Sequence, residues 1–222
     1  MSTSANQISL NLLNCLDSED ERKLLARFLT CECVLPDRPG VLGIASERAP
    51  SKGSILEFGV YKGASIRYLS DLFPGRRIYG FDSFVGLPEP WVRTTDGKFY
   101  GVGHFRLTQK PTVPDNVTLV EGYFESTLPV WLSSFNGIVA LLHIDADLYS
   151  SAKFVLESLD RYLVPEVVIV FDELCDWQNS GVYSAWPDGE WKAFCAWINA
   201  SKFNFEVIAR GVQYSAAIRI TA

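Results

Sequence analysis

Short apolar segments alternate with helical patterns along most of this chain, and the alternation limits the fold more than any other feature. The expected strands lie at 55–58, 77–81, 117–121, 138–144 and 167–171, and helical periodicity is found near 63–73, 150–162 and 189–201. A run as apolar as Ile138–Leu142 suits a strand that helices cover on both faces. The sequence therefore predicts an α/β fold with a doubly wound, mostly parallel sheet.

The C-terminal part breaks this alternation. Two strand-like runs, 203–210 and 214–220, are separated by only Gly211, Val212 and Gln213. Since a linker this short cannot hold a crossover helix, the two runs must pair antiparallel. We expect a seven-stranded sheet that ends in an antiparallel hairpin, which is the methyltransferase variant of the Rossmann-like architecture rather than the dinucleotide-binding one.

The sequence of the N-terminal part predicts helical structure. Ser18 and Glu21 form a capping box ahead of an apolar stripe, which indicates an amphipathic helix near 19–34. A chain of 222 residues, 48% of them hydrophobic, suits a single domain. We expect residues 1–50 to form a helical cap on an α/β core that spans 54–222.

Composition restricts the partners. A formal net charge of -6 and a pI near 5.0 argue against a nucleic-acid surface, which needs basic residues. No apolar run approaches the ~18 residues of a membrane span, and the N-terminal segment lacks the pattern of an export signal. The five cysteines show no metal-type spacing and are expected as free thiols. The sequence predicts a cytoplasmic protein that acts on a small molecule, with self-association left open.

The first candidate site follows the first core strand, where the sequence reads LEFGVYKGAS. Gly59 and Gly63 bracket a tight strand-to-helix turn, at which a ligand can approach the backbone and the helix N-terminus. The spacing differs from the G-x-G-x-x-G of dinucleotide-binding turns. Glu57 offers an acceptor-only carboxylate suited to a methionyl group through water. Tyr61 and Ser65 complete the candidate cofactor residues of this turn, whose structural alternative is a glycine turn beside an exposed glutamate.

Two further strand ends carry candidate cofactor residues. Asp82 lies roughly 20 positions beyond the glycine turn, where a carboxylate can bind ribose hydroxyls, and Ser83 follows it. Gly122 ends another strand, so that a flat ring can lie against the backbone between Tyr123 and Phe124. The alternatives are a helix-capping aspartate and a plain turn with a core phenylalanine.

Acidic residues end the next two strands. Asp145 and Asp147 follow the run Ile138–Ile144, and Asp172 with Glu173 follows the next strand. Adjacent parallel strands bring their carboxyl ends to one sheet edge, the place where ligands bind in such folds. Asp145, Asp172 and Glu173 are candidate ligands of Mg²⁺, which prefers hard oxygens. Asp145 and Asp147 are the candidate catalytic bases.

The segment 83–116 is long and shows no clear hydrophobic periodicity. It contains four prolines and several aromatic residues. A long irregular segment in a compact domain is typically a lid or binding loop, so we expect it to cover the substrate, the alternative being a surface insertion. The aromatic residues Trp177, Tyr183, Trp186 and Trp191 are expected to form an exposed substrate wall or a subunit contact.

Four motifs, LEFGVYKGAS, YGFDSFVGLPE, VEGYFESTLP and HIDADLYSSA, occur in this order and resemble the macrocin O-methyltransferase family of class I S-adenosylmethionine-dependent methyltransferases. The resemblance is close over about residues 54–175. It implies that Glu57, Gly59 and Gly63 hold the methionyl part of the cofactor, that Asp82 holds the ribose, and that 122–124 border the adenine. It also implies a divalent metal at the acidic strand ends, although the family usually has two aspartates where this chain has Asp172-Glu173.

These observations together predict an O-methyltransferase that acts on a hydroxyl of a small molecule, plausibly a sugar or glycosylated natural product. A substrate oxygen would attack the sulfonium methyl group in line, with Asp145 or Asp147 accepting the proton. Three alternatives stay open: an N-methyltransferase, a Rossmann-type oxidoreductase, and a binding protein that has kept the cofactor pocket.

Overall fold

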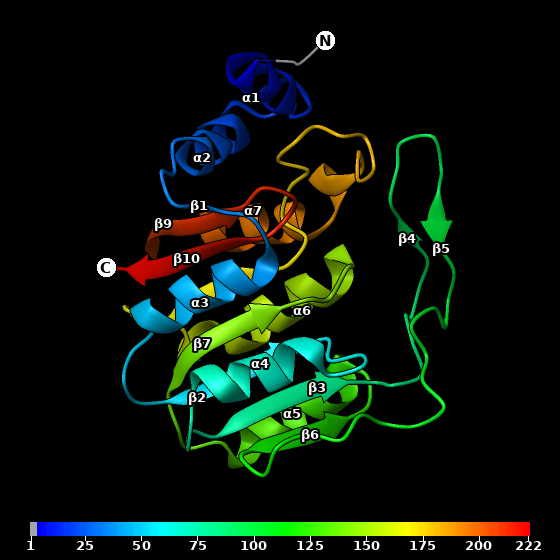
Figure 1. Ribbon diagram of the computed structural model, residues 1–222, viewed down its shortest axis with the longest axis vertical. Coiled ribbons are helices and arrows are strands. Elements are labelled where there is room, and N and C mark those ends of the chain that lie inside the picture. The colour runs from blue at the N-terminus through cyan, green and yellow to red at the C-terminus, as the bar shows by residue number, and fades with distance from the viewer. Residues whose placement is uncertain (1–3) are drawn as a thin grey trace.

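The computed structural model describes residues 4–222 and contains a central mixed sheet with helices on both faces (Figure 1). The sheet has eight strands in the order β1-β9-β10-β8-β7-β2-β3-β6. In chain order these are β1 (Val34–Leu35), β2 (Ser54–Phe58), β3 (Ile78–Asp82), β6 (Val117–Glu121), β7 (Val139–Ile144), β8 (Val168–Phe171), β9 (Asn204–Gly211) and β10 (Ala216–Thr221). Strand β10 runs antiparallel to β8 and β9, and the other pairs are parallel. The predicted fold class and terminal hairpin are confirmed.

The prediction of seven strands was wrong by one. Strand β1 comes from the segment expected to be helical cap, and it pairs parallel with β9 through Val34 opposite Arg210. Helix α2 (Glu19–Leu29) begins at the predicted Ser18 cap but ends earlier than position 34. Thr30 caps the helix, and the residues after it gain hydrogen bonds at the sheet edge instead, where the carbonyls of Cys33 and Leu35 accept from the amides of Arg210 and Val212.

Five of the helices described in residues 4–222 form two layers, one on each face of the sheet. The helices are α1 (Ala5–Asn14), α2, α3 (Arg38–Arg48), α4 (Ala64–Leu72), α5 (Phe124–Ser134), α6 (Tyr149–Leu159) and α7 (Glu190–Ala200), with short 3₁₀ turns η1 (Asp160–Tyr162) and η2 (Trp186–Asp188). Helices α3 and α4 cover one face of the sheet, and α5, α6 and α7 cover the other (Figure 1). In β8, Val168 and Val170 face the first layer while Ile169 and Phe171 face the second, as the two-residue strand period requires. This is the doubly wound arrangement that the apolar runs predicted.

The segment 83–116 is more ordered than its sequence indicates. It contains a small antiparallel pair, β4 (Trp91–Val92) and β5 (Phe99–Tyr100), which lies beside the main sheet (Figure 1). Its backbone is tied to the loop after β8, since the Ala185 amide donates to the Arg93 carbonyl at 3.2 Å. The segment therefore packs against the body of the protein through its first strand.

The aromatic residues between β8 and α7 are buried, which contradicts the expected exposed wall. Trp177 and Trp191 pack against Phe28 of α2 with ring centroids 5.9 Å apart in each pair. Tyr183 and Trp186 are likewise almost inaccessible to solvent. Large aromatic rings bury more apolar area than other side chains. Trp177 and Trp191 therefore hold α2 against the core and are not exposed for contact with a substrate.

All five cysteines are free thiols, as predicted. Within residues 4–222, none of the helices is both long enough and apolar enough to cross a membrane.

Candidate active site

Strand register places the candidate residues at one edge of the sheet. Phe58 pairs with Ile144, and Ile144 pairs with Phe171, so the three strands end level with one another. A cavity of about 320 Å³ lies at this edge. Most of the predicted site residues line it, namely Gly59, Tyr61, Ser65, Asp82, Ser83, Tyr123, Phe124, Asp145, Asp147, Asp172 and Glu173. Three predicted residues, Glu57, Gly63 and Gly122, do not form its wall.

The wall has two parts, which we call the glycine-turn half and the carboxylate half. The glycine-turn half comprises residues 59–62, Ala64, Ser65, Asp82, Ser83, Tyr123 and Phe124. The carboxylate half comprises Asp145, Asp147, Asp172 and Glu173. Both parts face one cavity, so a ligand bound at one half lies beside the other.

In the glycine-turn half, Gly59 is required by the sheet. Its φ is +95°, and a Cβ atom built there would lie 1.8 Å from the backbone oxygen of Asp145. Any side chain would thus push β2 away from β7. Helix α4 begins at Gly63 without a side-chain cap, which leaves amide groups of its first turn for a ligand.

Asp82 holds this turn in place. Its Oδ2 atom accepts hydrogen bonds from the amides of Val60 at 2.8 Å and Tyr61 at 2.7 Å, and its Oδ1 atom accepts one from Phe84 at 2.6 Å. Tyr61 has a φ of +47°, which is costly for a tyrosine and is stabilised by this bond. Asp82 therefore serves as a backbone clamp in addition to lining the cavity.

Glu57 lies beneath the cavity rather than in its wall. The side chain is fully buried, and its Oε1 atom is 2.9 Å from Nδ1 of His143. The expectation that Glu57 faces the cofactor is thus not met by its position, because the strand turns this carboxylate into the sheet interior. His143 is equally buried.

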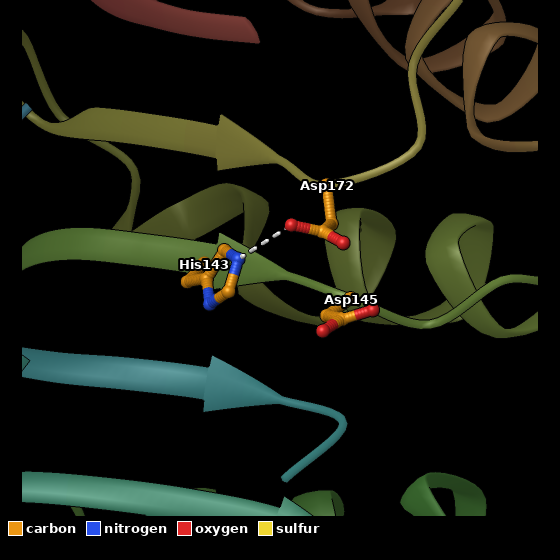
Figure 2. Close-up of side chains that lie close together, drawn as sticks. All are labelled: His143, Asp145 and Asp172. Atoms are coloured by element: carbon orange, nitrogen blue, oxygen red, sulfur yellow. Dashed lines mark ion pairs between the residues drawn. The ribbon is translucent and has the colours of Figure 1, made fainter. Parts of the chain in front are cut away.

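A charged cluster forms the centre of the carboxylate half (Figure 2). One atom each from His143, Asp145 and Asp172 lie within 4.8 Å of one another. Figure 2 shows the imidazole directed at Asp172, with Nε2 of the ring 3.7 Å from Oδ1 of the carboxylate. Nη1 of Arg38, at the start of α3, bridges the Oδ2 atoms of Asp145 at 3.0 Å and Asp172 at 2.8 Å.

The cluster shifts the pKa values of its members in different directions. Burial and the neighbouring Asp172 raise the pKa of Asp145 well above its usual range. Burial acts the same way on Asp172, but His143 and Arg38 outweigh it and lower the pKa of that carboxyl. Burial alone would lower the pKa of His143, yet Asp172 and Glu57 raise it to about 10. The histidine is therefore a buried cation between two carboxylates at neutral pH.

Asp147 is held in a strained turn at the cavity. Its φ is +59°, and the Leu148 amide donates to the Ala146 carbonyl at 2.6 Å across it. Non-glycine residues in this conformation cluster at functional sites. Burial, followed by the nearby Asp145, raises the pKa of Asp147 well above its usual range.

Glu173 is separate from the cluster and faces the segment 83–116, which we call the lid segment after the role expected for it. Its Oε2 atom is 3.1 Å from Nη1 of Arg93, whose guanidinium also lies over the rings of Trp91 at 4.3 Å and Tyr183 at 4.8 Å. Burial raises the pKa of Glu173 to about 7, although Arg93 opposes the shift.

Sequence reasoning missed both arginines of the site. Arg38 is 107 positions from Asp145, and Arg93 is 80 positions from Glu173. The sequence does mark the start of α3, because Asp37 caps it by accepting from the Gly40 amide at 2.8 Å and Pro39 follows in the first turn. Recognising this helix start would not have revealed that its first residue reaches the carboxylates.

Comparison with known proteins agrees with this geometry. The mostly parallel sheet with its terminal antiparallel hairpin is the methyltransferase variant of the Rossmann-like fold, as the sequence predicted. The chain belongs to the methyltransferase domain family, whose model matches residues 56–174.

Individual relatives are more distant. The 8-demethyl-8-(2,3-dimethoxy-alpha-L-rhamnosyl)-tetracenomycin-C 4'-O-methyltransferase of Streptomyces olivaceus is 26% identical over 140 residues, which cover 54% of this chain and 52% of that protein. The chain thus spans about half the length of this curated relative. The calicheamicin methyltransferase CalS11 has the same fold, with a TM-score of 0.62, 24% identity, and coverage of 99% of this chain and 94% of that one. An O-methyltransferase from Bacillus cereus in complex with SAH gives a TM-score of 0.51 at 14% identity, covering 100% of this chain and 92% of the other.

Proposed function

We propose that this protein transfers a methyl group from S-adenosylmethionine to a hydroxyl of a small molecule, and that the acceptor is a sugar or a glycosylated natural product. The observation that carries the proposal is a single cavity in which the glycine-turn half and the carboxylate half face each other. The Streptomyces olivaceus relative is by its name an O-methyltransferase of a rhamnosylated tetracenomycin, which supports a sugar acceptor.

The glycine-turn half suits the cofactor. The uncapped start of α4 and the pocket-facing Asp82 offer polar groups for its methionyl and ribose parts, while Tyr123 and Phe124 offer apolar surface for its base. When bound, S-adenosylmethionine supplies a methyl group on a positively charged sulfur. Holding this group against an acceptor in one cavity can lower the barrier by up to roughly 7–11 kcal/mol.

The carboxylate half suits a hydroxyl acceptor. A hydroxyl must lose its proton as the new bond forms, and the raised pKa of Asp145 makes this carboxylate a stronger base than an ordinary aspartate. Arg38 fixes its Oδ2 atom, whereas its Oδ1 atom accepts no hydrogen bond from any residue in 4–222 and so stays available to the acceptor. Asp147 is the second candidate base, since it lines the same cavity.

The same carboxylates fit a divalent cation. Oδ1 of Asp172 is buried without a hydrogen-bond partner in the described chain, so this carboxylate has an oxygen atom left for a ligand. We assign Asp145 and Asp172 as the residues that would hold Mg²⁺, which would polarise the acceptor hydroxyl there. With the cation bound, Asp147 would be the base in place of Asp145, because a carboxylate that holds a cation is less basic. Glu173, the third candidate ligand from the sequence, forms an ion pair with Arg93 instead.

Removing the metal tests this part of the proposal. Excess chelator should abolish methyl transfer, added Mg²⁺ should restore it, and the affinity for S-adenosylhomocysteine should stay within about twofold, because the metal is assigned to the acceptor side. Full turnover in chelator, with no metal in the purified protein, would remove the metal and leave Arg38 as the cation of the carboxylate half.

The activity itself is tested with a panel of acceptors. Calorimetric titration with S-adenosylhomocysteine first establishes cofactor binding. The protein is then incubated with S-adenosylmethionine and rhamnosylated polyketides, nucleotide sugars, free sugars and amines, and products are read by mass spectrometry. Methylation of hydroxyls confirms the proposal, methylation of amines alone replaces it with N-methyl transfer, and binding without turnover across the panel favours a binding protein.

A further inference from the structure

Glu190 is a buried carboxylate outside the cavity that contacts both acidic loops. It is the first residue of α7 and is fully buried. Its Oε1 atom accepts a hydrogen bond from the Ala146 amide at 3.2 Å, and its Oε2 atom accepts one from the Glu173 amide at 3.1 Å. Each of the two loops of the carboxylate half is thus bound by one oxygen of the same side chain.

The contacted amides are adjacent to the residues that face the cavity. Ala146 lies between Asp145 and Asp147, and Glu173 follows Asp172 directly. The loops leave neighbouring strands β7 and β8, and the last backbone bond between them joins the Asp172 amide to the Ile144 carbonyl at 2.9 Å. The chain segments that follow, which carry the side chains into the cavity, make no further backbone hydrogen bond to one another within residues 4–222. Glu190 connects them there.

Burying this carboxylate is costly, which argues that it is kept for its geometry. Burial, followed by repulsion from Asp172, raises the pKa of Glu190 well above its usual range. The cost is offset only by the two amides and by the N-terminus of α7. The start of the helix is itself built for close approach, because a Cβ on Gly189 would lie 2.2 Å from the hydroxyl oxygen of Tyr183.

We propose that Glu190 is a positioning residue that sets the distance between Asp145 and Asp172, and thereby the geometry of acceptor activation. The inference rests on the proposed methyl transfer and adds to it a residue that touches neither cofactor nor acceptor. A carboxylate suits this task because it has two equivalent oxygen atoms, and both accept hydrogen bonds. A glutamine offers one oxygen and would place an NH₂ group against the second amide.

Glu190→Gln tests the proposal, with Asp188→Asn as the matched control because Asp188 is exposed and lies two residues away. We expect Glu190→Gln to lower kcat roughly 10–100-fold, the size of effect that a small misplacement of reacting groups produces. The affinity for S-adenosylhomocysteine should stay within about twofold, since both amides that Glu190 binds lie in the loops of the carboxylate half. The control should retain full activity.

A second readout does not depend on turnover. Hydrogen exchange at the amides of Ala146 and Glu173 should accelerate in Glu190→Gln while the β2 and β3 amides stay as protected as in the wild type. If Glu190→Gln fails to fold, Glu190→Asp, which is one methylene shorter and reaches only one amide, replaces it with the same expectation. Unchanged kcat with unchanged exchange at both amides, or an equal loss of kcat and cofactor affinity, would overturn the proposal. A wild-type protein without activity would instead overturn the proposed function, and the exchange result would still decide the role of Glu190.

Discussion

The two halves of the cavity are stabilised in different ways. In the glycine-turn half, Asp82 binds three backbone amides, two of them in the preceding turn and one just after itself. In the carboxylate half, the charges of Asp145, Asp172 and Glu173 are balanced by Arg38 and Arg93, which come from a distant helix and from the lid segment. One half is therefore fixed by its own backbone, and the other by side chains from distant parts of the chain, which include His143 and Glu190 as well as the two arginines.

This difference suggests a division of labour. A site held by backbone hydrogen bonds keeps its shape whether or not a ligand is present, which suits recognition of an invariant cofactor. Ion pairs with arginine side chains can separate and reform as an acceptor or a cation enters. Perturbing the carboxylate half should thus change chemistry, and perturbing the glycine-turn half should change binding.

The largest effect is expected for Asp145→Asn. This substitution keeps the shape of the side chain but removes the proposed base, so kcat should fall roughly 10²–10⁴-fold. Affinity for S-adenosylhomocysteine should be retained, and Asp71→Asn on the exposed surface of α4 serves as the control. Activity close to that of the wild type would transfer the role of base to Asp147.

The second effect concerns the pH dependence of stability through His143. Its pKa is raised from 6.5 to about 10, so the charged imidazole contributes stability that is complete below pH 6.5 and is lost as the pH rises through 10. The free energy of unfolding should decline by up to about 1.4 kcal/mol per pH unit inside this window. Urea unfolding of wild type, His143→Gln and the exposed control His104→Gln measures the slope. A slope that persists in His143→Gln would assign it to another group.

The same contrast explains what the sequence could predict. The strands β2, β3, β6, β7 and β8 were predicted to within about one residue at each end, because long apolar runs and glycine turns are local signals. Strand β1 was missed because a strand of two residues is too short to show the alternation of apolar and polar residues. The burial of Trp177 and Trp191 was also missed, because it depends on Phe28 of α2.

The candidate site shows this limit at the level of single residues. The positions of Asp145 and Asp172 could be predicted because parallel strands deliver their ends to one edge. The direction of Glu57 could not, since strand phase alone does not say whether a strand-end carboxylate points into the sheet or the cavity. Arg38 could not be predicted either, because its contact joins residues 107 positions apart.

A third, smaller effect is expected in the glycine-turn half. Asp82→Ala removes a charged acceptor and releases the turn, so affinity for S-adenosylhomocysteine should fall by about 1.5–3 kcal/mol, roughly 10–100-fold. Asp82→Asn should lose less, since its remaining oxygen can still accept from Val60 and Tyr61. Calorimetry measures both variants. An unchanged affinity in a folded Asp82→Ala protein would remove Asp82 from the cofactor site and leave it a purely structural clamp.

The smallest effect should come from the ion pair that joins the lid segment to the carboxylate half. Arg93 and Glu173 are each only 15% exposed, so their interaction exceeds that of a surface pair, and a double-mutant cycle with Arg93→Met and Glu173→Gln should give a coupling of about 1 kcal/mol. Breaking the pair should accelerate hydrogen exchange in residues 91–100 and leave β2 and β3 unaffected, whereas Arg106→Met, at an exposed lid position, should change neither. In the wild type, cofactor and acceptor together should slow exchange in the lid segment, because Trp91 and Arg93 line the cavity and would contact ligands bound there. Equal exchange in the free and fully bound protein, together with zero coupling, would show that the lid is fixed independently of the site and that the carboxylate half responds to ligands through Arg38 alone.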